Sequence, residues 1–188
     1  VVLNVLLAGA RFETEALLIL ENRLSGLDDL LSRVPAGTPI YVASGAVIDR
    51  IAGFHLHRGI LAVGRRGDEL GVDALLASLP SQALVVALAG IANHDNMGSI
   101  FRNAASFGAD AVLLDPACCD PLYRKAIRVS VGAALRVPFA RAAALDSLIA
   151  SLGEQGFDIV ALSPGGTTDI RDVRPGQRTA LLLGTEGA

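Results

Sequence analysis

The feature that most constrains this chain is a helix-like segment held between two apolar runs. The apolar runs cover residues 83–91 and 111–115, and the segment between them reads NHDNMGSIFRNAASFGAD. Asp95 or Asn96 is suited to cap its first turn, and Gly108 is suited to the position just past its end. Strand, loop, helix and strand in this order predict a βαβ unit, in which polar groups gather where a strand ends and a helix begins.

The predicted helix has an apolar side and a narrow polar side. At about 100° per residue, Arg102, Asn103 and Ser106 share a polar arc, and Gly98 allows another backbone to approach closely. The apolar side comprises Ile100, Phe101, Ala104, Ala105 and Phe107. Spacing alone is equally compatible with an ordinary crossover helix, on which Arg102 is merely solvated.

Helices and strands continue to alternate after this unit. The hydrophobic pattern predicts helices over residues 121–129 and 145–155 and strands over residues 135–139, 158–162 and 179–183. Such an order requires an α/β fold with a mostly parallel sheet and helices on both faces. Ligands are then expected at the carboxyl ends of the strands.

Two glycine-containing loops, residues 163–167 and 184–187, follow predicted strands. Each loop taken singly also fits a plain tight turn. The chain has neither GxGxxG nor GxxxxGK[S/T], which are the phosphate-binding fingerprints of common nucleotide-binding domains. A nucleotide-dependent oxidoreductase on a doubly wound sheet is therefore an alternative without its glycine fingerprint or its acidic ribose ligand.

Residues 1–70 form a separate block with the pattern of a small α/β domain. The pattern predicts helices over 1–10, 27–34 and 46–52 and strands over 16–20, 39–43 and 60–63. Residues 64–70 are polar and glycine-containing, which favours a linker, and residues 72–79 predict a short helix beyond it. We therefore expect two domains, 1–70 and 71–188.

The net charge gives no general basic surface for nucleic acid. The 188 residues carry a formal charge of −3, so any RNA binding has to be local. All basic residues except Lys125 are arginines, which bind phosphate bidentately and stack on bases. The candidate patch in the first block consists of His55, His57, Arg58, Arg65 and Arg66. For the two histidines, a solvated loop and strand edge is the competing interpretation.

Neither a membrane segment nor a metal site is predicted. No apolar run reaches the roughly 18 to 20 residues of a membrane span, and the start lacks the basic flank of a signal peptide. We therefore expect a soluble, cytoplasmic protein. Cys118 and Cys119 are adjacent and are the only cysteines, a spacing that favours small buried or loop thiols over a disulfide or metal ligands.

Three segments of the second block gain meaning when they are taken together. They are residues 96–109 (NMGSIFRNAASFGA), 125–133 (KAIRVSVGA) and 182–187 (LLGTEG). In sequence, order and spacing they resemble signature segments of the SpoU (TrmH-like) RNA ribose 2′-O-methyltransferases. The resemblance implies transfer of a methyl group from S-adenosylmethionine to a ribose 2′-hydroxyl in tRNA or rRNA.

The resemblance also implies a fold and an assembly. Proteins of this family have an α/β domain whose C-terminal segment forms a deep trefoil knot, and they act as homodimers with each site at the interface. The first block is similar, more weakly, to the ribosomal-protein-like RNA-binding domain that often precedes the methyltransferase domain. RNA and a second copy of the chain are therefore the expected partners.

Site residues follow from the resemblance position by position. Arg102 is expected to be catalytic, and Asn96 to shape the site around it. The expected cofactor-binding residues are Leu162, Ser163, Gly184, Thr185, Glu186 and Gly187. The expected RNA-binding residues are Arg102, Asn103, Ser130, Arg58, Arg65 and Arg66, with Ser130 near the target nucleotide.

Two questions stay open at this level. Arg102 either accepts the hydroxyl proton, although arginine is normally a very weak base catalyst at neutral pH, or stays charged, binds a phosphate and stabilises developing negative charge. In addition, the family carries a third motif beyond the GTEG turn, whereas this sequence stops at Ala188 and opens with Val1. We expect either a portion of a longer protein or a variant that cannot bind the methyl donor. The second case corresponds to a non-catalytic RNA-binding protein on the same scaffold.

Overall fold

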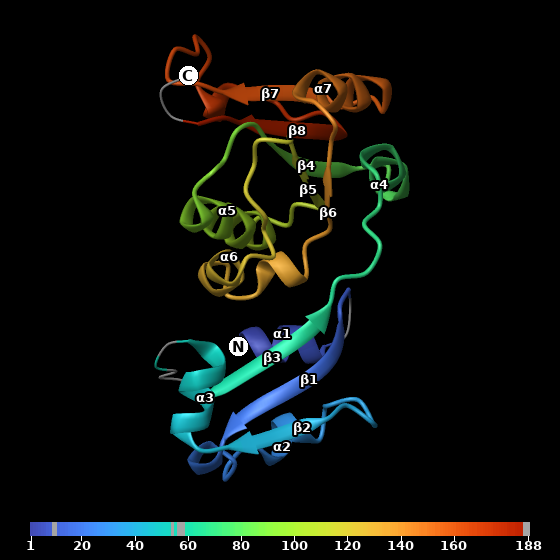
Figure 1. The fold of residues 1–188 in the computed structure, drawn as a ribbon. Helices are drawn as coiled ribbons and strands as arrows, with labels where there is room; N and C mark the ends of the chain where they lie inside the picture. The colour runs from blue at the N-terminus through green and yellow to red at the C-terminus, as the bar shows by residue number, and fades with distance from the viewer. Residues whose placement is uncertain (9–10, 54, 56–58, 186–188) are drawn as a thin grey trace. The chain divides into compact units, whose positions relative to one another are not determined.

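The computed structural model describes residues 1–8, 11–53, 55 and 59–185 (Figure 1). The chain divides into two compact units, Val1–Gly67 and Asp68–Ala188. Among the expected site residues, Arg58, Glu186 and Gly187 lie outside the described residues, as does His57. None of the helices that the structure describes has the length and apolar character that a membrane-spanning helix requires.

The first unit contains a three-stranded sheet with short helices around it. Its elements are α1 (Val2–Leu7), β1 (Glu13–Leu20), α2 (Asp28–Leu31), β2 (Ile40–Ala43), α3 (Gly45–Ala52) and β3 (Ile60–Arg65), with the 3₁₀ turn η1 (Glu21–Arg23) after β1. The strand order is β2-β1-β3, with β2 parallel and β3 antiparallel to β1. Leu17, Ile19 and Ile48 are fully buried and form the centre of its core.

The linker predicted over residues 64–70 begins two residues too early. Gly64 and Arg65 belong to β3, because they pair with Thr14 and Glu13 of β1. Pairing with a strand distant in sequence overrides the turn preference of a glycine-containing segment. The helix predicted over residues 27–34 is also shorter, since only Asp28–Leu31 is α-helical.

The second unit is built on a five-stranded sheet in which every pair of neighbouring strands is parallel. Its strands are β4 (Ala83–Leu88), β5 (Ala111–Leu114), β6 (Phe139–Arg141), β7 (Asp158–Leu162) and β8 (Arg178–Leu183). Their order is β6-β5-β4-β8-β7 (Figure 1). The predicted α/β fold with a mostly parallel sheet is confirmed.

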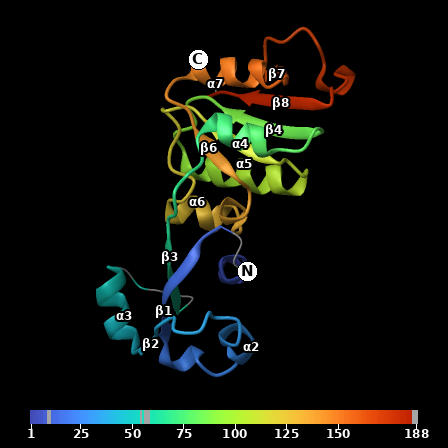
Figure 2. The same ribbon diagram turned by 90° about the vertical axis from the view of Figure 1, so that its right-hand side faces the viewer.

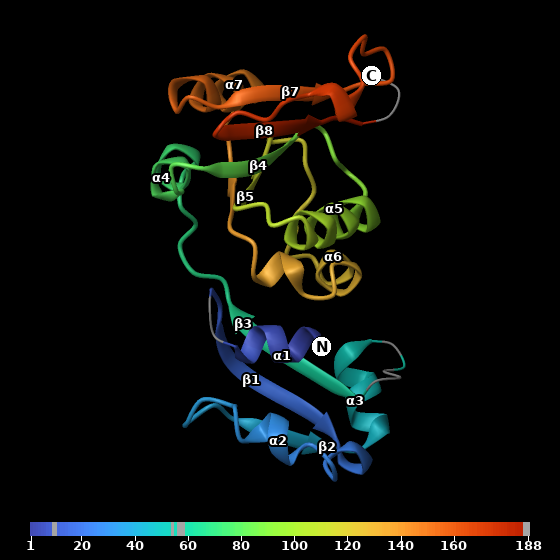
Figure 3. The ribbon, with the colours of Figure 1, turned by 180° about the vertical axis from the view of Figure 1, so that it is seen from behind.

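Helices cover both faces of this sheet. They are α4 (Val72–Ser78), α5 (His94–Ser106), α6 (Arg124–Val129) and α7 (Leu145–Glu154), with the 3₁₀ turns η2 (Ala133–Leu135) and η3 (Ile170–Asp172). α4 and α7 contact each other over one face, which Figure 2 views from their side. α5 packs on β5 from the other face, and Figures 1 and 3 show α5 between the sheet and α6.

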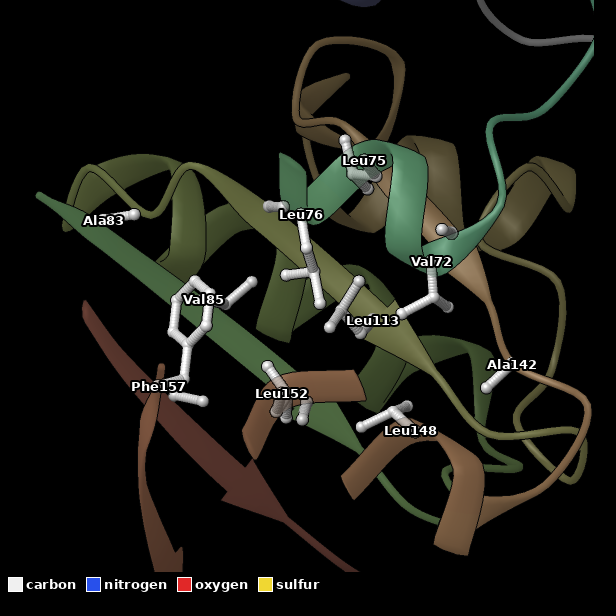
Figure 4. Close-up of a cluster of buried hydrophobic side chains, with 14 residues drawn as sticks. Val72, Leu75, Leu76, Ala83, Val85, Leu113, Ala142, Leu148, Leu152 and Phe157 are labelled. Carbon is white, nitrogen blue, oxygen red and sulfur yellow. The ribbon is translucent and has the colours of Figure 1, made fainter. Parts of the chain in front are cut away.

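The core alternates along the strands, as a pleated sheet requires. Val85 and Leu113 point toward α4 and α7, within the cluster of buried apolar side chains shown in Figure 4. Phe139 packs its ring against Phe101 of α5, in an edge-on contact with 5.8 Å between ring centroids. The strands therefore contribute side chains to both helix layers, Val85 and Leu113 to one and Phe139 to the other.

Three local predictions for this unit were wrong. β6 begins at Phe139 rather than residue 135, because Ala133–Leu135 forms η2. α6 begins at Arg124 rather than residue 121. Phe107, predicted on the apolar side of α5, is 82% exposed, because the helix ends at Ser106 and Phe107 only caps its C-terminus.

Candidate functional site at the carboxyl edge of the parallel sheet

The carboxyl ends of four strands lie side by side at one edge of the five-stranded sheet. Leu88, at the end of β4, is in register with Leu114 of β5 on one side and Leu183 of β8 on the other. Leu183 is in turn in register with Leu162 of β7. The loops that leave these strands therefore meet at a single edge, where ligands of parallel α/β sheets are expected.

The loop leading into α5 lies directly against the turn that follows β8. The backbone amide of Ala89 donates to the carbonyl oxygen of Leu183 at 2.8 Å. Gly90 has a φ of +69°, and a Cβ added there would lie 3.3 Å from Cγ2 of Thr185. A glycine is thus favoured at position 90 by its backbone conformation and by the closeness of the second segment.

The N-terminus of α5 is capped by Asn93, not by Asp95 or Asn96 as predicted. Oδ1 of Asn93 accepts hydrogen bonds from the backbone amides of Asp95 at 2.7 Å and Asn96 at 3.4 Å. Asn93 has the extended backbone of an N-cap residue, whereas the other two residues already lie in the first turn. The side chain of Asn96 is therefore left exposed at the start of the helix.

α5 and α6 approach each other closely at Gly98. A Cβ at this position would lie 2.7 Å from the carbonyl oxygen of Ala126 and 2.7 Å from Cβ of Val129. Nζ of Lys125 also donates to Oδ2 of Asp95 at 2.6 Å. The predicted close approach at Gly98 is confirmed, and two of the three signature-like segments pack as one body.

Arg102 lies one helical turn beyond Gly98 on the same side of α5. Its side chain is exposed, as is that of its neighbour Asn103. Within the part of the chain that the structure describes, neither side chain forms a hydrogen bond or ion pair. Both are consequently available to an external polar group.

Ser130, in contrast, is engaged inside the protein. It is 1% exposed, and its hydroxyl donates to the carbonyl of Ile127 at 2.9 Å and accepts from the amide of Ala134 at 3.3 Å. The next residue, Val131, has a φ of +56°, a conformation that is costly for a β-branched residue. This geometry supports a role for Ser130 in shaping the turn after α6 and does not support a contact with a nucleotide.

Sequence reasoning missed a hydrogen-bonded clamp formed by Arg141. Its Nη1 donates to the carbonyls of Asp115 and Cys118, both at 2.8 Å, and its Nη2 donates to that of Cys119 at 3.3 Å. The amide of Cys119 then donates to the carbonyl of Ile91 at 2.9 Å. The clamp thereby ties β6 to the loop after β5 and to the loop before α5. A lone arginine after a short strand carries no sequence signal for such a contact.

The two cysteines are structural in this network. Sγ of Cys118 accepts from the amide of Ile91 at 3.3 Å, and burial raises the pKa of its thiol to about 11. Burial also raises the pKa of Cys119. The raised pKa values favour the protonated form of both thiols. Among the described residues, no group of three or more His, Cys, Asp or Glu side chains is placed to hold a metal ion.

The ends of β7 and β8 offer an accessible, mixed apolar and polar surface. Leu162 is 41% exposed, and Ser163 is exposed beside it. A Cβ at Gly184 would meet no atom within 4 Å, so backbone groups at this turn are open to approach. Thr185 completes the described part of the turn. An exposed apolar side chain therefore lies next to accessible backbone groups at this edge.

The expected RNA-binding arginines of the first unit are less available. Arg65 forms an ion pair with Glu15, with its Nη2 2.7 Å from Oε1, and this partner raises the pKa of Arg65 further. Nδ1 of His55 lies 2.7 Å from Oδ2 of Asp49. Arg66 also has an interaction within the described structure. The patch predicted from the sequence is therefore partly neutralised by its acidic neighbours.

Comparisons with known proteins agree with this arrangement. The model of the SpoU rRNA Methylase family matches residues 83–188. An uncharacterized tRNA/rRNA methyltransferase of Mycobacterium tuberculosis is 43% identical over 182 residues, which cover 95% of this chain and 62% of the relative. The chain thus spans less than two thirds of the length of such relatives.

Two solved structures share the fold at low sequence identity. An rRNA methyltransferase from Sinorhizobium meliloti has a TM-score of 0.79 at 21% identity, over 100% of this chain and 69% of that one. The SpoU methyltransferase AviRb from Streptomyces viridochromogenes, solved with AdoMet, has a TM-score of 0.81 at 21% identity, over 100% of this chain and 72% of that one. By its family match and by its sheet and signature segments, the chain belongs to the SpoU rRNA methylase family.

Proposed function

We propose that the protein transfers a methyl group from S-adenosylmethionine to a ribose 2′-hydroxyl of tRNA or rRNA. The observation that carries the proposal is the contact between the loop leading into α5 and the signature turn after β8, where Gly90 lies against Thr185. Further support comes from family membership and from a structural neighbour described as an RNA 2′-O ribose methyltransferase, with a TM-score of 0.73.

S-adenosylmethionine would be held at the ends of β7 and β8. Leu162 supplies an exposed apolar surface, and Ser163 and the residues 184–187 supply backbone and side-chain polar groups. The open space at Gly184 fits a ligand that approaches the backbone closely. Bound there, the cofactor supplies an electrophilic methyl group. Structures from Sinorhizobium meliloti and Streptomyces viridochromogenes have been solved with AdoMet, which supports this assignment.

Arg102 acts in this proposal as a charged positioning group. An exposed guanidinium keeps its charge in water, and it binds a phosphate bidentately. Gripping the target phosphate brings the 2′-hydroxyl into line with the methyl group, and the positive charge stabilises the oxygen as its proton leaves. Asn96 and Asn103, exposed on the same helix, supply hydrogen bonds to the ribose and its neighbours.

The assembly belongs to the same proposal. We assign the first unit to RNA binding, with Arg58, Arg65 and Arg66 as contacts, and we place the protein in the cytoplasm as a homodimer. β8 is the last strand that the structure describes, yet it lies inside the sheet between β4 and β7. This late insertion supports, for the methyltransferase unit, the trefoil-knotted topology of the family.

Methyl transfer to purified tRNA and rRNA from a strain lacking the gene tests the proposal. Arg102→Ala should lower kcat/KM by about 100-fold or more, because charge stabilisation at the reacting oxygen is lost. S-adenosylmethionine affinity, measured by isothermal titration, should change less than about two-fold because the cofactor residues are untouched. Arg174→Ala, another exposed arginine of this unit, is the control.

The role of Arg102 is tested by Arg102→Lys. A charged positioning group should leave measurable methyl transfer in this variant. Complete loss of transfer with unchanged RNA affinity would contradict that role and favour proton acceptance by the arginine. If the unchanged protein binds RNA but not S-adenosylmethionine, the non-catalytic RNA-binding alternative replaces the proposed function.

A further inference from the structure

One segment of the chain carries several basic residues and no acidic residue. Residues 121–145 contain five basic residues and no acidic one, so all 19 aspartates and glutamates lie outside it. The basic residues are Arg124, Lys125, Arg128, Arg136 and Arg141. In a chain of net charge −3, such a segment creates a local positive surface that the overall charge conceals.

The geometry of α6 turns part of this charge outward. Ala126 and Val129 face α5, as their contacts at Gly98 show. At about 100° per residue, Arg124 and Arg128 then lie together on the opposite side of the helix. Arg128 is exposed, and its side chain forms no hydrogen bond or ion pair with the residues that the structure describes.

Arg136 is a further exposed basic residue of this segment, close to α6. It follows η2, which packs against both α5 and α6, and its side chain is exposed without a described partner. α5 and α6 run in parallel register, since Asp95 meets Lys125 and Gly98 meets Val129. Arg102, one turn beyond Gly98, is therefore beside the end of α6, which carries the exposed Arg128.

The acidic groups nearest to these arginines already have partners or lie at the two ends of the basic segment. Asp95 is paired with Lys125 at 2.6 Å, and Oδ1 of Asp115 accepts from the buried amide of Cys118. Asp120 and Asp146 flank the segment at its two ends. Tyr123, 55% exposed at the start of α6, adds an aromatic ring to the surface. Exposed arginines beside an aromatic ring favour RNA, since they bind its phosphates and stack on its bases.

We propose that Arg128 and Arg136 form a phosphate-binding surface over which the RNA backbone passes on its way to Arg102. The inference rests on the proposed function, which it deepens by naming the part of the second unit that holds the RNA. We call these two residues and the α6–η2 layer that carries them the arginine surface. Each of its arginines contacts one phosphate and releases the counterions of that phosphate.

Filter binding of unfractionated tRNA and of rRNA fragments, over a series of salt concentrations, tests the surface. Arg128→Glu combined with Arg136→Glu should weaken binding by about ten-fold or more at 0.1 M salt. The slope of log K against log salt should decrease by roughly 1.5 to 2, as expected for two lost phosphate contacts. The double lysine variant keeps both charges, so its slope should equal that of the unchanged protein.

Arg174→Glu combined with Arg171→Glu is the control; Arg171, unlike Arg128 and Arg136, is paired with Asp169 at 2.7 Å. It makes the same change in net charge at two exposed arginines of the second unit that lie outside residues 121–145. Its RNA affinity should change less than about three-fold, since distant exposed charges are screened. Equal losses of RNA affinity in the two glutamate variants would overturn the proposal. It would also be overturned if the Arg128/Arg136 glutamate variant lost binding to phosphatidylglycerol vesicles but kept its RNA affinity. Thermal unfolding of both variants checks that folding is intact.

The test separates this inference from the proposed function. If the unchanged protein binds tRNA or rRNA but neither binds S-adenosylmethionine nor transfers methyl groups, the proposed function fails and the arginine surface stands. If methyl transfer occurs and the Arg128/Arg136 variant binds RNA like the control, the arginine surface fails alone. If the unchanged protein binds neither RNA, both are overturned.

Discussion

The two faces of the five-stranded sheet are covered by helices in different ways. On one face, α4 and α7 bury large aliphatic side chains against the strands, among them Leu76, Leu148 and Leu152 (Figure 4). On the other face, α5 buries Phe101 against β6 and meets α6 through a close backbone approach at Gly98. α5 also presents Arg102 to solvent.

The contrast separates stability from positioning. Aliphatic burial is roughly proportional to area and tolerates small shifts, so the α4–α7 face mainly stabilises the unit. A glycine contact holds two backbones at one distance and therefore sets the position of the polar groups that they carry. Asn96, Arg102 and Asn103, the exposed polar residues of α5 in the candidate site, lie on the face that is set by contact distance.

The largest expected effect tests the aliphatic face. Leu148→Ala should lower the free energy of unfolding by about 3 kcal/mol, because it leaves a cavity under α7 where Leu148 is fully buried. Urea denaturation measures the loss. Ile149→Ala, on the same helix at 37% exposure, should cost less than about 1 kcal/mol. Equal losses of unfolding free energy in the two variants would show that α7 does not bury Leu148 against the sheet.

The next effect compares matched glycines on the two faces. Gly98→Ala should destabilise the protein by about 2 kcal/mol, because the new Cβ would meet a backbone carbonyl at 2.7 Å. Gly153→Ala in α7 has nothing within 4 Å and should stabilise by up to about 1 kcal/mol through helix propensity. Thermal unfolding of the two variants measures both signs. If both variants changed stability in the same direction, the distinction between the two faces of the sheet would be wrong.

A third effect concerns the edge where the candidate site lies. Arg141→Met should cost about 2 kcal/mol, since three carbonyls lose their charged donor. Hydrogen exchange at the amide of Cys119, which bonds Ile91, should become faster. Arg136→Met, at an exposed position five residues earlier, should leave both measurements nearly unchanged. Unaltered exchange in the Arg141 variant would argue against a clamp that acts through this loop.

The smallest effect is expected for the ion pair between α5 and α6. A double-mutant cycle with Asp95→Asn and Lys125→Met should give a coupling of about 0.5 kcal/mol, because both side chains are about half exposed. The coupling should disappear near 1 M salt. A coupling above about 2 kcal/mol that persists in salt would mean that the pair, rather than Gly98, holds α5 and α6 together.

Sequence reasoning predicted the candidate site unevenly. The exposed polar arc of α5 follows from helical period, because it depends on residues near one another in the chain. The close approach at Gly98 was predicted from residue type, because glycine has no Cβ. The capping residue Asn93, the burial of Ser130 and the pairing of Arg65 with Glu15 do not. Each depends on a backbone angle or on a partner that local pattern does not specify.

By itself, the sequence determined the class of fold, because the alternation of apolar runs with amphipathic segments admits few arrangements other than a parallel sheet between helices. The family resemblance came from the three signature segments and not from this alternation. Only the tertiary structure decided the strand order β6-β5-β4-β8-β7 and the contact of Gly90 with Thr185. It also decided that Arg141 clamps the loop after β5. The physical reason is that periodicity records which side of an element is buried, whereas these features join residues distant in the chain through hydrogen bonds and close contacts.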